Sequence, residues 1–260
     1  MDYFTIFQRK GYTLCCVGKY LLLLLLCFPA SLLHVQGFEA DSLPAGRPSG
    51  TEWHAMLLPA SLLVTGSLMN AGAIKFRVNE ALGGITHTHI DDYLEFGPLV
   101  ELAGADAAGC KAQHGIPEQL KYLVATEIIG TGIVQAVKRM TNIRRPDGTN
   151  YSFPSGHTTQ AFAGATLLFM EFHESCLPLA LSGYGLALTT GFLRMTNNRH
   201  WLPDVVAGAG LGILVPWLLE SIASFREWHP FQAAPAQVSL YPGTAAGFAQ
   251  TGVTLRITFR

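Results

Sequence analysis

A polar stretch at residues 138–157 reads KRMTNIRRPDGTNYSFPSGH and interrupts an otherwise apolar part of the chain. The apolar stretches on either side have helical length and predict helices over 117–140 and 155–173. Lys138 and Arg145 are seven residues apart, about two helical turns, so both side chains could reach one anion from the same side. Because a proline follows Arg145, the first helix should end there and continue as a loop. Taken alone, the pattern also suits a solvated basic helix end.

The remainder of the chain repeats this alternation of apolar segments and polar breaks. Strand signals are nearly absent before the tail, so we predict an all-α fold, a six-helix bundle. If consecutive helices run antiparallel, the loops around residues 138–157 and 194–204 lie at the same end of the bundle. The helices are expected near 54–74, 91–107, 117–140, 155–173, 177–195 and 203–222.

The amino-terminal segment has the features of an export signal. Three basic residues precede an uninterrupted apolar run over 20–33, which is shorter than the roughly 20 residues that cross a bilayer. We therefore predict a signal peptide over 1–37, cleaved after Gly37, with an uncleaved anchor as the alternative. Its removal would leave Cys110 and Cys176, which an oxidising compartment would allow to pair.

Three further regions are expected after the signal peptide. Residues 38–53 contain Pro, Gly and Ser without apolar periodicity and predict a linker, and residues 54–228 form the helical-bundle domain. The tail, residues 229–260, alternates apolar and polar side chains from Val253 to Phe259, which predicts a short strand. A poorly ordered end is the alternative for this tail.

Composition excludes several classes of function. Charged residues make up only 13% of the 260 residues, against about a quarter in an ordinary soluble domain. Lys and Arg total 17 against 18 for Asp and Glu, so no broad basic surface is available and nucleic acid is not expected as a partner. The sequence HTHIDD at 87–92 could supply metal ligands, but alternate histidines before an Asp-capped helix more often have a structural role. His89 or Asp92 could still line the mouth of a site.

The segment Pro154-Ser155-Gly156-His157 predicts a helix amino terminus that can hold an anion. Free backbone N–H groups at such a terminus carry partial positive charge, and glycine lets an oxyanion approach closely. The alternative is an ordinary serine N-cap followed by a surface histidine.

A third polar group consists of Arg194, His200 and Asp204. Because His200 and Asp204 are four residues apart, one helical turn would bring the carboxylate to one imidazole nitrogen and leave the other as a nucleophile. Arg194 would offer a forked donor to phosphate oxygens. An Asp that merely caps the last helix is the alternative. Together the three groups suit phosphoryl transfer through a phosphohistidine, with no metal or other cofactor.

At these residues the sequence resembles the type 2 phosphatidic acid phosphatase and haloperoxidase superfamily. The three motifs together are far more specific than any one of them, and the resemblance covers roughly residues 55–222. The matching positions are Lys138 to Pro146 for the first motif, Pro154 to His157 for the second, and Arg194, His200 and Asp204 for the third.

The resemblance implies a helical bundle with catalytic loops at one end and a role for each motif residue. His200 would attack phosphorus, Asp204 would orient it, and His157 would protonate the leaving alkoxide. The phosphoryl oxygens would be held by Lys138, Arg145, Ser155, Gly156 and Arg194. Leu193 stands where the family has serine, a departure that bears on phosphate affinity or substrate choice.

The sequence therefore predicts a metal-independent phosphatase of the acid phosphatase or phosphatidic acid phosphatase type in the bacterial cell envelope. Its substrate is expected to be a phosphomonoester: a lipid phosphate, a polyprenyl or lipid A phosphate, or a small phosphoester. One alternative is a vanadate-dependent haloperoxidase, in which vanadate takes the position of phosphate. Another is a non-catalytic envelope protein that binds anionic headgroups.

The relation of the bundle to the membrane has two readings. Two charge-free stretches, 55–74 and 177–193, have the length of a membrane span. Acidic residues fall within or near other predicted helices, at a cost of about 2.5–3.5 kcal/mol for a charge such as Asp at mid-bilayer. We expect an exported, periplasmic bundle that is largely soluble or peripherally attached, with an integral membrane protein as the alternative.

Overall fold

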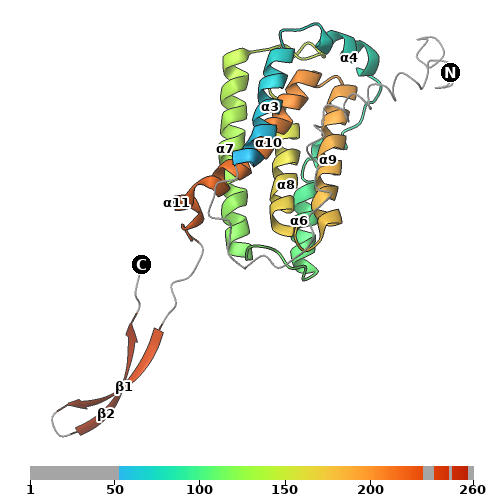
Figure 1. Cartoon of the computed structure of the whole chain (residues 1–260). Helices are drawn as coiled ribbons and strands as arrows, with labels where there is room; N and C mark the ends of the chain where they lie inside the picture. The colour runs from blue at the N-terminus through green and yellow to red at the C-terminus, as the bar shows by residue number, and fades with distance from the viewer. Residues whose placement is uncertain (1–52, 231–236, 246–247, 257–260) are drawn as a thin grey trace.

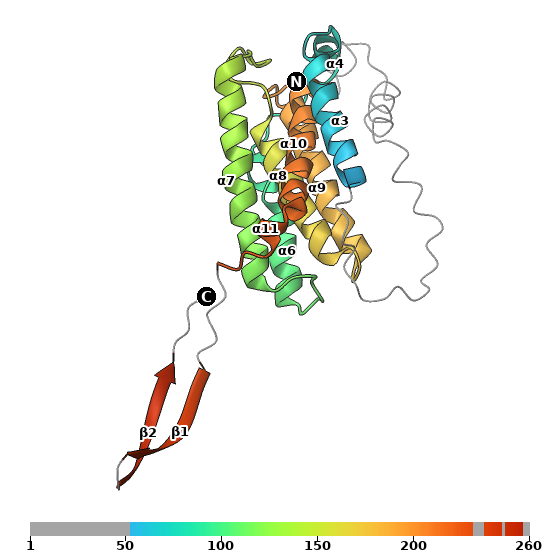
Figure 2. The ribbon, with the colours of Figure 1, turned by 60° about the vertical axis from the view of Figure 1, so that its left-hand side comes forward.

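The computed structural model describes residues 53–230, 237–245 and 248–256. The predicted signal peptide and nearly all of the predicted linker lie outside the described residues. Figures 1 and 2 show the long helices side by side, so the predicted all-α bundle is confirmed. In chain order the helices are α3 (Trp53–Met69), α4 (Ile74–Leu82), α5 (Asp91–Leu94), α6 (Gly97–Ala107), α7 (Ile116–Thr141), α8 (Gly156–Phe172), α9 (Leu177–Thr196), α10 (Leu202–Ser221) and α11 (Ala223–Arg226).

Two parts of the bundle differ from the prediction. The helix expected over 91–107 is divided into α5 and α6, because Pro98 in the first turn of α6 cannot donate a hydrogen bond to the turn before it. The prediction also lacked α4, whose buried face consists only of Val78 and Leu82. Two buried apolar residues in a helix of nine give too weak a periodicity for the helix to be predicted from the sequence.

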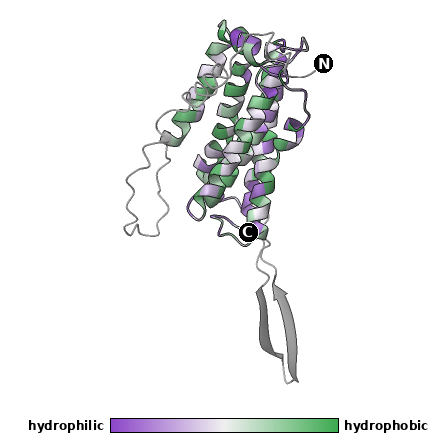
Figure 3. Cartoon of the chain, turned by 90° about the vertical axis from the view of Figure 1, so that its right-hand side faces the viewer, coloured by the Kyte–Doolittle hydropathy of each residue, from purple (hydrophilic) through white to green (hydrophobic). Residues whose placement is uncertain are grey.

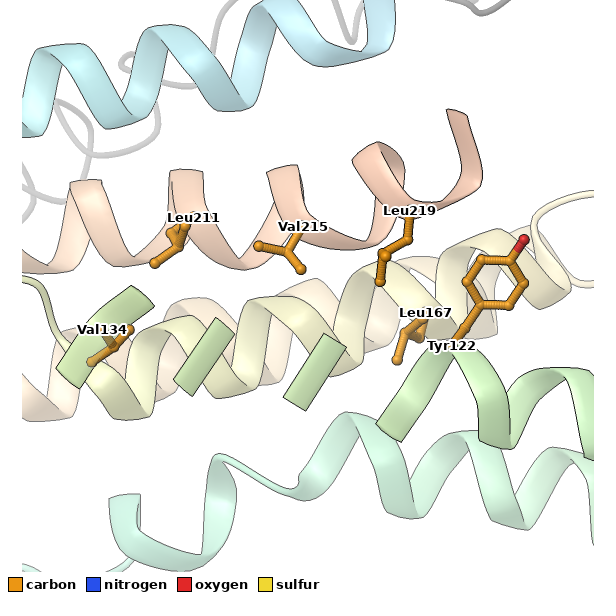
Figure 4. Packing of buried hydrophobic residues seen from close by; sticks show 6 residues of the cluster. All are labelled: Tyr122, Val134, Leu167, Leu211, Val215 and Leu219. Carbon is orange, nitrogen blue, oxygen red and sulfur yellow. The ribbon is translucent and has the colours of Figure 1, made fainter. Parts of the chain in front are cut away.

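Helix α8 runs through the middle of the bundle and buries most of its residues. Figure 4 shows part of the core around it, where apolar side chains of α7, α8 and α10 pack together. Glycines let α10 approach its neighbours closely: a Cβ at Gly212 would lie 2.4 Å from the carbonyl oxygen of Thr159. The labelled core residues are Tyr122 and Val134 of α7, Leu167 of α8, and Leu211, Val215 and Leu219 of α10.

Apolar surface also covers much of the outside of the bundle, and Figure 3 shows hydrophobic segments along the length of the helices. Among the described residues, α7 and α10 are long and apolar enough to cross a membrane, and the pair 55–69 and 74–82, bent by 91°, would add a third span. Neighbouring helices enclose 72% of the α10 segment but only 28% of the α7 segment. Helix α9, which contains the charge-free stretch 177–193, is not among these candidates.

The tail forms a hairpin. Strands β1 (Gln237–Ala245) and β2 (Phe248–Arg256) pair antiparallel, with Gln237 opposite Arg256 and Ala245 opposite Phe248. The sequence predicts one short strand in this region, and the structure has two, the second of which starts earlier than the alternation at 253–259 indicates. Residues 257–260 lie outside the described residues, and Figures 1 and 2 show the hairpin clear of the helices.

Both cysteines of the bundle lie at the end that carries the α6–α7 and α8–α9 connections. Cys110 follows α6 and is exposed, whereas Cys176 precedes α9 and is partly buried. Both thiols are free in the structure. The pairing that an oxidising compartment would allow is therefore not part of the fold described by the structure.

Candidate active site

The three motifs meet at one end of the bundle, around a pocket of about 560 Å³. Helix α7 ends and α8 begins at this end, and the connection from α9 to α10 lies beside them (Figure 1). The predicted placement of the polar loops at one end is thus confirmed. The pocket is lined by Gln135, Lys138, Arg139, Arg145, Asn150, Tyr151, Gly156, His157 and His200.

The loop between α7 and α8 carries Arg145 into this pocket. Helix α7 ends at Thr141, four residues before Arg145, because Asn142 adopts a left-handed conformation with φ of 44°. The helix thus ends close to the predicted residue 140, but Lys138 and Arg145 do not share the helix face that their spacing suggested. A turn closes instead: the N–H of Arg145 donates to the carbonyl of Thr149 at 2.7 Å. This turn, rather than a shared helix face, brings Arg145 to the same pocket as Lys138.

Two cations on the pocket wall keep donors that the protein does not use. Lys138 Nζ donates to the carbonyl of Tyr151 at 2.8 Å, and an ammonium group has three protons to offer. Arg145 Nε is buried without a hydrogen-bond partner among the described residues. Burial and then the nearby charge of Arg194 lower the pKa of Arg145, which nonetheless remains a cation. An anion in the pocket would supply the missing acceptors.

His200 is held as a neutral imidazole against Asp204. Its Nδ1 lies 3.4 Å from Asp204 Oδ2, and both side chains are almost completely buried. The same carboxylate oxygen accepts hydrogen bonds from the Ser152 hydroxyl and, at 2.9 Å, from the N–H of Trp201. Burial lowers the pKa of His200 to about 4, against the opposing effect of Asp204. A neutral imidazole oriented in this way can attack phosphorus through Nε2.

His157 lies in the first turn of α8 and is held by acidic residues of the α5 region. Its Nε2 is 2.9 Å from Asp92 Oδ1 and 3.6 Å from Glu95 Oε1. Burial and the charge of Arg194 lower the pKa of His157, and Asp92 partly offsets them. Burial raises the pKa of Glu95 to about 7. Asp92 therefore anchors the ring of His157 at the edge of the pocket, where it can act as a proton donor or acceptor.

Arg194 is not directed into the pocket as expected. Its Nη1 donates to Asp91 Oδ2 at 2.6 Å and to Asp92 Oδ1 at 3.0 Å, and it is absent from the residues that line the pocket. Its Nε is buried without a partner among the described residues. Arg194 thus connects to the phosphate pocket through Asp92, which also binds His157.

The helix amino terminus has the predicted serine N-cap, and its role as an anion site stays a prediction. Ser155 is the N-cap of α8: its buried hydroxyl accepts from the Thr158 hydroxyl at 2.8 Å and from the Thr158 N–H at 3.4 Å. Gly156 lines the pocket, and a Cβ there would meet nothing closer than Val134, at 3.7 Å. Packing within the protein does not require glycine at this position, so the open space is available to a ligand.

Several residues of the site were missed from the sequence. Asp91 and Asp92 were recognised only as negative charge at a helix start or as lining of the mouth, and Glu95 and Ser152 gave no signal at all. The HTHIDD segment contributes Asp91 and Asp92 to the Arg194 ion pairs, while His89 lies 3.4 Å from Asp92. Within the described part of the chain, no group of three or more potential ligands from His, Cys, Asp and Glu is placed to hold a metal.

Comparisons with known proteins agree with this arrangement. Residues 130–228 match the model of the PAP2 superfamily. Lipid A 1-phosphatase of Porphyromonas gingivalis is 32% identical over 220 residues, which are 76% of this chain and 48% of that protein. Lipid A 4'-phosphatase of Bacteroides thetaiotaomicron is 31% identical over 108 residues, which are 42% of this chain and 45% of that protein. The chain thus spans about half the length of these two curated relatives.

A third relative and one solved structure are also similar to this chain. Phosphatidylglycerophosphatase B of Bacillus subtilis is 25% identical over 169 residues, which cover 58% of this chain and 79% of that protein. The crystal structure of Aquifex aeolicus LpxE covers 57% of this chain and 95% of its own, with a TM-score of 0.45 and 22% identity. The PAP2 match contains all three motifs, from Lys138 to Asp204.

Proposed function

We propose that this protein is a metal-independent phosphatase that hydrolyses a phosphomonoester of a lipid through a phosphohistidine intermediate. One observation carries the proposal: a buried, neutral His200 is oriented by Asp204 and lines the same pocket as Lys138 and Arg145. A nucleophile with a depressed pKa beside unmet cationic donors is suited to phosphoryl transfer.

The proposed reaction has two steps. In the first, His200 Nε2 attacks phosphorus while the bond from phosphorus to the leaving oxygen breaks, and His157 gives that oxygen its proton. In the second, water attacks the phosphohistidine, His157 takes a proton from the water, and inorganic phosphate leaves. Asp204 stabilises the positive charge that develops on His200.

The transition state places negative charge on the three non-bridging oxygens of the phosphoryl group. Lys138, Arg145 and the backbone N–H of Gly156 are the donors that we assign to these oxygens. Ser155 caps the amino terminus of α8, where the N–H of Gly156 is free. We assign Arg194 an indirect role through Asp92. These donors are in place before the substrate arrives and therefore need little reorganisation.

A lipid phosphate is the proposed class of substrate. The relatives are a lipid A 1-phosphatase, a lipid A 4'-phosphatase and a phosphatidylglycerophosphatase. The outward face of α7 supports a lipid surface beside the site, since Ile116, Leu120, Val124 and Ile128 follow one another at intervals of four residues and are 45–68% exposed. We therefore place the protein in the bacterial cell envelope, exported and embedded in the membrane, with this face in contact with lipid.

The decisive measurement is phosphate release from para-nitrophenyl phosphate and from a short-chain lipid phosphate, with and without a chelator. We expect activity in the chelator, and a loss of at least about 1000-fold in His200→Ala. Acid quench of the wild type during turnover should trap acid-labile phosphate on His200. Equal activity in the wild type and His200→Ala would disprove the mechanism.

Membrane attachment has its own test. Alkaline carbonate extraction of expressing cells should leave the protein in the membrane pellet. Release into the supernatant would instead support the soluble or peripheral bundle that the sequence alone favours. The result does not depend on activity, so it separates localisation from chemistry.

A further inference from the structure

Ser152 is a buried polar side chain that the proposed reaction does not use. It lies in the loop between α7 and α8, is 0% exposed, and is not among the residues that line the phosphate pocket. Its hydroxyl donates to Asp204 Oδ2, and the same oxygen lies 3.4 Å from His200 Nδ1. Ser152 therefore contacts the partner of the nucleophile and can act on the reaction only through Asp204.

The backbone fixes this hydroxyl from two sides. The N–H of Ser152 donates to the carbonyl of Ile143 at 2.8 Å, within the same loop. The N–H of Ser155 donates to the carbonyl of Asp204 at 3.0 Å, which ties the end of the loop to the first turn of α10. Because main-chain bonds hold Ser152 against Asp204, the hydroxyl needs no rearrangement to reach the carboxylate.

The two carboxylate oxygens of Asp204 have unequal surroundings. Oδ2 accepts hydrogen bonds from the Ser152 hydroxyl and from the N–H of Trp201, the latter at 2.9 Å, and it faces His200. Oδ1 is buried and has no hydrogen-bond partner among the described residues. The last torsion of an Asp side chain is broad and roughly two-fold, so a carboxylate without fixed donors could present either oxygen. The two donors at Oδ2 decide which oxygen faces the imidazole.

The shared oxygen Oδ2 is a weaker partner for His200 than an oxygen without other donors would be. A hydrogen bond to a carboxylate stabilises its charge, so an oxygen that already accepts two bonds is a weaker acceptor for a third group. The distance of 3.4 Å to His200 Nδ1 is longer than the roughly 2.7–3.2 Å of an ordinary N–H···O bond. Burial has the largest effect on the pKa of His200 and lowers it, while Asp204 raises it. The other charged or titratable side chains on the elements next to His200 are Lys138 of α7, Arg145 and Asp147 of the α7–α8 loop, His157 of α8, Arg194 of α9 and Arg199.

We propose that Ser152 is a positioning residue for the nucleophile: its hydroxyl holds Asp204 Oδ2 opposite His200 and shares that oxygen with the imidazole. The inference rests on the proposed function, because Ser152 acts on the histidine that we assign as the nucleophile. When the bond from His200 Nε2 to phosphorus forms and the bond to the leaving oxygen breaks, Nδ1 keeps its proton and the ring becomes positively charged. Asp204 stays ionised throughout, and Ser152 keeps it in place for that charge.

The test is the pH profile of Ser152→Ala with para-nitrophenyl phosphate, measured in the same chelator as the wild type. Loss of the hydroxyl leaves Oδ2 a stronger acceptor for His200, which stabilises the protonated ring. The acidic limb of kcat/KM should therefore move up by about 0.5–1 pH unit. Because the orientation of Asp204 is less fixed, kcat should fall about tenfold, whereas KM should stay within about twofold since the phosphoryl donors are unchanged.

Two further variants separate positioning from packing. A thiol is only a weak donor, so Ser152→Cys should move the limb in the same direction by a smaller amount, and it carries the test if Ser152→Ala does not fold. Thr190→Val is the matched control, since its hydroxyl is fully buried but bonded within α9 to the carbonyl of Leu186. This variant should keep the wild-type limb and the wild-type kcat.

The direction of the shift separates the inference from the proposed function. If both Ser152 variants keep the wild-type limb, whatever their kcat, Ser152 has a structural role only and the inference is wrong. A limb that moves to lower pH also overturns it, because Ser152 would then strengthen the bond between Asp204 and His200 instead of sharing its oxygen. In both cases the phosphatase function stands. If the wild type does not hydrolyse para-nitrophenyl phosphate, or if His200→Ala is equally active, the proposed function and the inference fail together.

Discussion

The two ends of α7 each bury a lysine, and the two lysines have opposite surroundings. Lys121, 2% exposed, donates to three backbone carbonyls after α10, at 2.9–3.3 Å, and pairs with Glu118. Lys138, 7% exposed, donates to one carbonyl and lines the pocket that contains Arg145 and His200. At one end the protein itself satisfies the charge, whereas at the other donors remain for a ligand. Burial of a cation therefore does not mark a functional site; unmet donors beside a pocket do.

The largest expected effect separates the two lysines directly. We expect Lys138→Met to lower kcat/KM by about 100- to 1000-fold with little change in the unfolding midpoint, because the lost group is one of the donors that we propose for the phosphoryl oxygens. Lys121→Met should lower the free energy of unfolding by about 3 kcal/mol, since three backbone carbonyls would lose their donor and Glu118 its ammonium partner, while kcat of the folded protein stays near the wild-type value. Steady-state kinetics and denaturant unfolding measure the two effects. If the Lys121→Met protein had normal stability but no activity, the distinction between a structural Lys121 and a functional Lys138 would be wrong.

We call the end of the bundle that carries the phosphate pocket the active end, and its expected pH dependence follows from His200. Because its pKa is lowered to about 4, the nucleophile stays neutral down to that pH, and kcat/KM should fall about tenfold per pH unit only below it. An unperturbed histidine would already lose activity near 6.5. In the unfolded chain His200 would take up its proton first, so the stability from keeping it neutral is lost as pH falls from about 6.5 through 4.

The control for this profile is the carboxylate beside the nucleophile. Asp204 raises the pKa of His200 against the effect of burial, so Asp204→Asn should move the acidic limb to lower pH as well as reduce the rate. Circular dichroism at each pH would confirm that the protein is still folded. A limb that stays near 6.5 in both proteins would show that His200 is not the titrating nucleophile.

A smaller effect is expected where the active end depends on α5. Asp92 holds His157 and raises its pKa. Asp92→Asn removes this charge and so lowers the pKa of His157, which leaves less of the protonated, acid form available. We expect kcat for an alkyl phosphate to fall about tenfold, and kcat for para-nitrophenyl phosphate to change less because its leaving group needs little protonation. Equal losses for both substrates would indicate a structural role for Asp92.

The smallest effect concerns Leu193, the position at which the family has serine. Leu193 does not line the phosphate pocket, and its neighbour Arg194 is already paired with Asp91 and Asp92. We therefore expect Leu193→Ser to change kcat/KM by less than about threefold, as for a substitution outside the reacting groups. A gain of tenfold or more would show that the missing serine limits phosphate binding at this end of the bundle.

Much of the active end follows from local spacing. The interval of four residues between His200 and Asp204 is enough to predict their contact, and Pro154 to His157 is enough to predict the helix amino terminus that lies at the pocket. The same reasoning failed for Arg194, because its acidic partners are about a hundred residues away in sequence. No periodicity within α9 contains that information.

The all-α class, the order of the apolar segments and the residue types suited to phosphoryl transfer can be predicted from the sequence, because helical periodicity and motif spacing are local properties. Which cations face the pocket, and which are neutralised by the protein, depends instead on contacts between distant segments. Examples are Asp92 with His157, 65 residues apart, and Lys121 with the carbonyl of Trp228, 107 residues apart. Such contacts form only when the helices pack against one another.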